Sequence, residues 1–217
     1  MDEFWTADET AFRSRAAAFF GGLSASGSGE AGRPLEEIWR EASRPAAEDD
    51  AGGPSFGSRL SGRVSVLDEA ARSDPKLGRG LLAWLESATP FDPAQHAACE
   101  LGRLAGTASH VFAAATSAAR ERGYFSSILM NFRAVQERLA RLMAESELAR
   151  FGACRLCRLL ERGDTISAGR ETAGLEARAA ALAADIRSVA AELLGPAWTE
   201  SRLPDGDGPS VEERIRR

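Results

Sequence analysis

Closely spaced cysteines are the first residues in this chain that could do chemistry. Cys154 and Cys157 form a Cys-x-x-Cys pair, a spacing that occurs in zinc sites and in thiol redox centres. The pair falls inside a predicted helix instead of a turn, and the third cysteine, Cys99, provides no second pair to complete four ligands. Because free cysteines are among the most buried residue types, we expect all three to pack in the core.

The two histidines, His96 and His110, could bind a metal ion or transfer a proton. They lie about four turns apart in one predicted helix, so they cannot ligate one ion from adjacent turns. The sequence also has no Ser/His/Asp arrangement, Gly-rich phosphate loop or helix-borne metal motif. On residue chemistry alone we expect no metal site and find no active site.

Length and composition narrow the class of protein. The chain has 217 residues, of which 44% are hydrophobic and 27% charged, and this is enough for one large domain or two small ones. A net charge of −5 with the charges mixed throughout argues against a nucleic-acid partner. No apolar run is long enough for a membrane span, and the acidic start is unlike a signal peptide. We therefore expect a soluble bacterial protein of the cytoplasm, with no membrane partner.

Helical periodicity runs through the whole chain, and no segment alternates convincingly as a strand would. We expect linkers at 24–32 and 43–55. The expected helices are one from the capping box Thr6–Glu9 to Gly21-Gly22, one opening at Pro34, then 57–72, 77–85, 93–122, 130–162, 167–194 and a last short one from Ser210. The predicted fold is all-α: an N-terminal helical part, residues 1–89, packed on a C-terminal antiparallel helical bundle, residues 93–217.

One segment resembles a known family. Arg122–Arg133, RGYFSSILMNFR, is followed by Leu139–Leu142, LARL. This order is similar to the R-x-x-F-G-x-x-[IL]-x-x-x-Q…L-A-x-M segment that opens the second helix of the C-terminal domain in acyl-CoA dehydrogenases. Ala149-Arg150 and the helix end at Leu159–Gly163 also match, as do the turn at 192–198 and the final 211–217. More loosely, Leu67–Pro75 is similar to a segment of the family's N-terminal helical domain.

Two departures from the family bear on catalysis. Residue 89 runs directly into Pro93, where the family has a β-domain that covers the flavin ring, so we expect that domain to be missing. The chain also ends at Arg217, before the position of the Y-E-G-T segment whose Glu commonly serves as catalytic base. Some members carry the base early in the first long helix, and that position is His96 here. We therefore assign no catalytic residue and expect no activity from this chain alone.

The resemblance also implies cofactor contacts. In the family the motif Arg and Gln, with a Gly-Gly turn, reach the ADP part of FAD bound to a neighbouring subunit. The positions that could keep this role here are Arg122, Phe125, Arg133 in place of Gln, and Gly195 in the shortened turn Gly195-Pro196. The motif Gly is Ser126, and Glu192 replaces a second Gln. Arg122 and Arg133 could clamp a pyrophosphate or could instead form intersubunit salt bridges.

Two functions follow from the resemblance. The first is a non-catalytic subunit that pairs through the C-terminal bundle with a full-length, FAD-dependent acyl-CoA dehydrogenase and helps to hold its FAD in trans. The second is a helical scaffold or regulatory homo-oligomer that binds no flavin. A free-standing dehydrogenase is disfavoured, because the chain lacks both the expected base and the domain that would exclude water.

Overall fold

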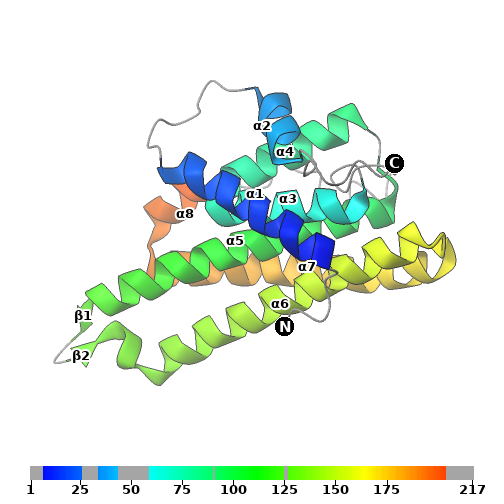
Figure 1. Cartoon of the computed structure of the whole chain (residues 1–217). Coiled ribbons are helices and arrows are strands. Elements are labelled where there is room, and N and C mark those ends of the chain that lie inside the picture. Colours follow the sequence, from blue (N-terminus) through cyan, green and yellow to red (C-terminus); the bar gives the residue numbers. More distant parts are fainter. Residues whose placement is uncertain (1–6, 26–33, 44–58, 90, 125–126, 204–217) are drawn as a thin grey trace.

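The computed structural model describes residues 7–25, 34–43, 59–89, 91–124 and 127–203 (Figure 1). In these ranges it has α1 (Ala7–Ala25), α2 (Leu35–Ala42), α3 (Leu60–Ser73), α4 (Pro75–Ala88), α5 (Pro93–Glu121), β1 (Gly123–Tyr124), β2 (Ser127–Ile128), η3 (Leu129–Asn131), α6 (Arg133–Glu161), α7 (Thr165–Leu193) and α8 (Pro196–Arg202). Phe125, the last short helix expected from Ser210 and most of both expected linkers lie outside the described residues.

The all-α prediction is confirmed, and the start expected for the helix at 93 is accurate. α5 begins with a capping box, in which the Asp92 carboxylate accepts from the Gln95 N–H at 2.8 Å and the Gln95 side chain accepts from the Asp92 N–H. The two helices expected at 57–72 and 77–85 are also present, as α3 and α4, and Asp74 separates them. The second of them starts at Pro75 itself and not at Leu77, because the Asp74 side chain accepts from the Lys76 N–H at 2.9 Å.

Four details of the fold differ from the sequence predictions. α1 continues through Gly21 and Gly22 to Ala25, since exposed glycines weaken a helix without ending it. The α5–α6 connection contains a small antiparallel hairpin in which Tyr124 pairs with Ser127, where no strand was expected. Two-residue strands are too short to show alternation. α6 consequently starts at Arg133, later than expected, and α8 was not anticipated.

Three antiparallel helices of equal length form the body of the fold. α5, α6 and α7 have 29 residues each, which makes each about 43 Å long at 1.5 Å per residue. α3 packs along α5, α4 contacts both, α1 lies across α3, and α2 contacts α1 and α4 (Figure 1). The hairpin projects at one end of α5 and α6. α4 passes directly to α5, and no β-domain lies between them.

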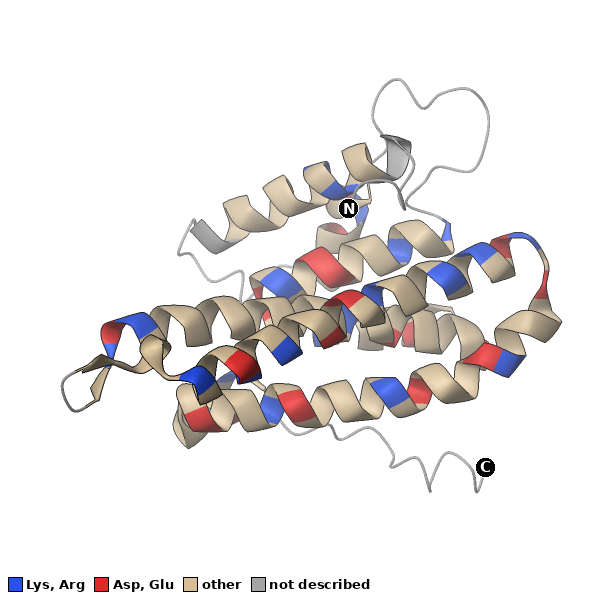
Figure 2. Cartoon of the chain, turned by 90° about the horizontal axis from the view of Figure 1, so that it is seen from below, with Lys and Arg blue, Asp and Glu red and all other residues tan. Residues whose placement is uncertain are grey.

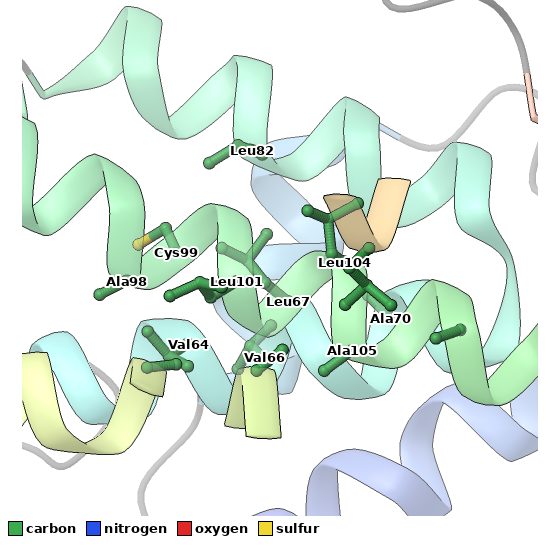
Figure 3. Packing of buried hydrophobic residues seen from close by; sticks show 14 of the residues in the cluster. Val64, Val66, Leu67, Ala70, Leu82, Ala98, Cys99, Leu101, Leu104 and Ala105 are labelled. Atoms are coloured by element: carbon green, nitrogen blue, oxygen red, sulfur yellow. The ribbon is translucent and has the colours of Figure 1, made fainter. Parts of the chain in front are cut away.

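α5 is the central helix of the core. Residues 101–108 of α5 are all buried, as expected for a helix that is packed on every side. Figure 3 shows Leu101 and Leu104 of α5 among Val64 and Leu67 of α3, and all four side chains are at most 4% exposed. Every element that carries a candidate site residue contacts α5 or a helix packed on it.

Gly106 sets the closeness of the α3–α5 crossing. A Cβ at this position would stand 2.0 Å from the carbonyl oxygen of Asp68 and 2.9 Å from the backbone nitrogen of Arg72. Both obstacles are backbone atoms of α3, so no side-chain rotation could relieve the clash. The crossing therefore requires glycine at residue 106.

We expect Gly106→Ala to lower the free energy of unfolding by about 1–3 kcal/mol, because α3 must move away from α5. Urea denaturation followed by circular dichroism measures the change. Gly174 is the matched control: it lies inside α7, is exposed, and a Cβ added there would meet no atom within 4 Å. Gly174→Ala should stabilise the protein by about 0.5–1 kcal/mol. Equal effects at the two positions would contradict a tight crossing.

Candidate functional site

Arg122 ties the end of α5 to the end of α7. It follows the last residue of α5, and its Nη1 donates a hydrogen bond to the carbonyl oxygen of Leu193 at 2.7 Å. Leu193 is the last residue of α7, so its carbonyl has no partner within the helix. One of the guanidinium's donors therefore caps a neighbouring helix, while Arg122 remains exposed as a residue.

Gly195 lies two residues beyond that carbonyl. Its φ of +98° belongs to the left-handed region that favours glycine, and its N–H donates to the Ala190 carbonyl at 3.0 Å. The chain reverses here and enters α8, where the Thr199 hydroxyl donates to the Gly195 carbonyl at 3.0 Å. The structure thus brings together Arg122 and Gly195, two of the four candidate cofactor residues, at one end of the bundle.

Arg133 does not join them through any contact in the described part of the chain. It is the first residue of α6, its side chain is 89% exposed, and its Nε donates to Glu137 of the same helix at 2.6 Å. An exposed pair of this kind contributes little to stability and leaves the guanidinium reachable from solvent. Phe125, the fourth candidate, lies outside the described residues.

A contact that the sequence did not reveal holds Glu192. Arg138 of α6 binds this carboxylate with both Nη2, at 2.6 Å, and Nε, at 3.3 Å, and Nη2 also donates to the Ser188 hydroxyl at 2.6 Å. The hydrogen bond from Arg138 lowers the pKa of Glu192, and the same bond raises the pKa of Arg138. Glu192 therefore carries its charge close to Gly195, but with a cation attached.

The Arg138 contact belongs to a row of pairs between α6 and α7. Arg155 binds Glu171 at 2.5 Å, and longer contacts join Arg141 to Asp185 and Arg178 to Glu145. Figure 2 shows cationic and anionic residues interspersed along these helices. Sequence spacing cannot identify such pairs, because the partners lie on different helices.

Apolar side chains are exposed beside Arg122. Tyr124 is 54% exposed, Ile128 41% and Phe132 37%, and the rings of Tyr124 and Phe132 meet edge to face at 5.7 Å. These three residues, here called the hairpin patch, come from β1, β2 and the residue before α6. Exposed aromatic residues next to a cation are typical of surfaces that contact another molecule.

The cysteines and His96 make contacts that explain them as structural residues. Cys99 and Cys157 are buried as predicted, Cys154 is half-buried, and burial raises the pKa of the Cys99 thiol to about 12. His96 Nε2 lies 2.7 Å from the Glu86 carboxylate of α4. Within the described ranges no group of three or more His, Cys, Asp or Glu residues could hold a metal ion.

None of the described helices combines the length and apolarity that a membrane span requires.

The strongest electrostatic feature is a buried ionic cluster between α3 and α6. Asp68 is 3% exposed, and its carboxylate receives Nε of Arg150 at 2.9 Å and Nη2 at 3.2 Å. Nη2 of Arg150 also donates to the Ser109 hydroxyl of α5 at 2.6 Å. Arg13 of α1 adds a third link, with Nη2 2.9 Å from Asp68 and 3.2 Å from Glu69. The cluster therefore joins α1, α3, α5 and α6.

The pKa values of the two carboxyl groups in this cluster, Asp68 and Glu69, shift in opposite directions. Burial raises the pKa of Asp68, but the attraction of Arg150, Arg13 and Arg72 and the Arg150 hydrogen bonds outweigh it, so the pKa lies below 3.8. Burial and the negative charge of Asp68 together raise the pKa of Glu69 above 4.5. Asp68 is thus the charged centre, and Glu69 is the acid more readily protonated.

Comparison with known proteins gives one family. The model for the C-terminal domain of acyl-CoA dehydrogenases matches residues 95–207, more than half of the 217 residues. The chain belongs to the acyl-CoA dehydrogenase family. No curated protein and no solved structure matches the chain.

The acyl-CoA dehydrogenase match begins in the first turn of α5 and extends past α8, so it contains both Arg122 and Gly195. Arg150 also lies inside it, whereas its partner Asp68 lies in the preceding helices. The ionic cluster therefore fastens those helices to the acyl-CoA dehydrogenase domain.

We expect Arg150→Met to lower the free energy of unfolding by about 3 kcal/mol, because the buried Asp68 loses its bidentate partner and keeps only Arg13 and the more distant Arg72. Adding Asp68→Asn should restore part of the loss, since the buried carboxylate that lost Arg150 is then removed. Arg155→Met is the control: its pair with Glu171 lies at the surface, so we expect a loss below about 1 kcal/mol. Urea denaturation of the four proteins measures these differences.

The same variants test the pH dependence. A lowered pKa means that the stability contributed by Asp68 is present above 3.8 and is lost as the pH falls below it. Arg150→Met should weaken this acid-induced loss, because the main cause of the low pKa is gone. The contribution of Glu69 has the opposite sign and lies above pH 4.5, so the two windows are separate. Unchanged acid sensitivity in Arg150→Met would contradict the assignment to Asp68.

Proposed function

We propose that this chain is a non-catalytic, acyl-CoA dehydrogenase-like subunit that pairs with a full-length flavin-dependent acyl-CoA dehydrogenase and helps to hold its FAD in trans. The observation that carries the proposal is the meeting of Arg122 with the Leu193–Gly195 turn at one end of the bundle. The family resemblance assigns both elements to the ADP part of a neighbouring subunit's FAD. They are more than seventy residues apart in the chain.

The chemistry of this end suits a pyrophosphate group. Arg122 donates a hydrogen bond from Nη1 to the Leu193 carbonyl, and this bond fixes the position of the guanidinium. The other N–H donors of the guanidinium can bind an anion. The hairpin patch beside it offers aromatic surface to a partner subunit. Arg133 directly follows Phe132 in the chain, and its exposure leaves it available to the same partner.

The direct passage from α4 to α5 supports a non-catalytic role. No β-domain is inserted there, at the place where the family has the domain that covers the flavin ring. His96 occupies the position of an alternative base, but its Nε2 contacts Glu86. An active site that excludes water would have to come from the partner.

A helical scaffold or regulatory homo-oligomer without flavin is the second candidate. Glu192 favours it, because this residue replaces a family Gln and places a carboxylate near Gly195. Its pair with Arg138 reduces the repulsion of an anion but also engages the cation that could have bound one. The two candidates differ in one measurable property, which is whether a complex containing this chain retains FAD through Arg122.

We expect Arg122→Ala to weaken FAD binding by about tenfold or more, because one charge-assisted hydrogen bond to the pyrophosphate is lost. The tagged chain is purified from its own host with its co-purifying chains, and FAD per complex is measured from flavin absorbance during stepwise dilution. Arg120→Ala is the matched control, since Arg120 is exposed in the last turn of the same helix.

Size-exclusion chromatography of each complex separates assembly from cofactor binding. Flavin loss from an intact Arg122→Ala complex supports the trans site. A wild-type preparation that contains this chain alone and no flavin would overturn it in favour of the scaffold. Equal flavin retention in Arg122→Ala and Arg120→Ala would refute the role of Arg122.

A further inference from the structure

A pocket of about 390 Å³ opens between α3, α5 and α6, away from the Arg122 end. His110 lines it, and twelve residues of α5, about 18 Å along the helix axis, separate His110 from Arg122. Its volume falls in the range of small-molecule sites, about 300–1,000 Å³. Neither the family assignment nor the proposed function uses it.

The pocket is lined by both apolar and polar side chains. The apolar ones are Phe112, Ala113 and Ala114 of α5 and Met143 of α6. The polar ones include Arg72 from the last turn of α3, Ser109 and Glu147. This combination suits a ligand with an apolar body and one polar group.

Two of the polar groups that line the pocket, Arg150 and Glu147, already have strong partners. Nη1 of Arg150 contacts Glu147, and its other donors go to Asp68, Ser109 and the Ala105 carbonyl. The charge of Glu147, the lining carboxylate among the described residues, is therefore matched by an adjacent cation. Neither residue gives the pocket an uncompensated charge.

Arg72 differs from these two groups. Its guanidinium lies 3.6 Å from Asp68 and 3.6 Å from Glu69, and in the described part of the chain no acceptor lies within hydrogen-bond distance of it. Its side chain is 42% exposed. Arg72 thus keeps donors free for an anion in the pocket.

His110 holds the end of α3 in place beside this cation. Its Nδ1 lies 3.0 Å from the carbonyl oxygen of Arg72, and because a carbonyl can only accept, Nδ1 donates. The ring stacks on Trp198 of α8 at 6.0 Å with an interplanar angle of 27°. The backbone of Arg72 is therefore held by α5, and α8 supports the ring that holds it.

We infer that this pocket binds a small carboxylate with an apolar body, whose carboxylate accepts hydrogen bonds from Arg72 and whose body packs on Phe112 and Met143. A planar guanidinium matches a carboxylate with two parallel N–H donors. A cationic ligand is disfavoured, because its charge would meet Arg72 while Glu147 is already bound to Arg150.

An NMR titration of the full ¹⁵N-labelled chain tests the inference with 3-phenylpropanoate as probe and 3-phenylpropanamide as its neutral counterpart. We expect amide shifts concentrated in residues 109–114 and 143–150, and binding of the amide that is about tenfold weaker or more. Arg72→Gln should weaken binding of the acid to a similar extent, and Arg72→Lys should lie between. Arg120→Gln, on α5 but outside the pocket, should bind as the wild type does.

A second variant keeps the test valid if Arg72→Gln proves unstable. Ala114→Phe fills part of the pocket without changing any charge and should abolish the amide shifts caused by the acid. Circular dichroism confirms the helical content of this variant. Equal binding of acid and amide, shifts outside the pocket, or the absence of any shift with the acid would each overturn the inference. None of these results depends on flavin or on a partner subunit.

Discussion

The buried pair between Asp68 and Arg150 is the interaction on which the arrangement of the helices depends. A charge as buried as Asp68 is costly unless it is paired and hydrogen-bonded, and here Arg150 supplies both contacts while Arg13 supplies another. These partners come from α6 and α1, so each helix is held at the position where it satisfies the same carboxylate. Apolar packing provides most of the stability, but it does not by itself fix how three helices slide along one another.

The close approach of α3 and α5 makes this pair possible. At Gly106 the backbone of α5 comes so near to Asp68 that a single added carbon would collide with its carbonyl oxygen. The same section of α5 supplies the Ala105 carbonyl and the Ser109 hydroxyl to Arg150. Small residues and a buried charge therefore act together, because the small residues allow the contact and the charge penalises any displacement from it.

Local signals in the sequence predicted much of this fold, whereas contacts between distant residues could not be read from it. The helical periodicity of α5 and its start at Pro93 depend on neighbours within a few residues, and both were predicted. The partner of Asp68 lies 82 residues away, and that of Arg138 lies 54 residues away. Helical spacing gives each residue's face but not which helix will cover it. The resemblance identified Arg122 and Gly195, yet only the structure brings them together, and it gives Arg133 a separate partner on its own helix.

The proposed role as a subunit depends on features at the two ends of α5. At its start α5 follows α4 directly, so no domain of this chain stands there to enclose a flavin ring. At its far end Arg122 caps α7 beside the left-handed turn at Gly195, and the hairpin patch remains exposed. Arg122 and Gly195, which the family resemblance associates with a neighbour's cofactor, thus lie together at one end of the bundle. A complex in which the partner supplies the enclosure and this chain supplies Arg122 would use each feature where it stands.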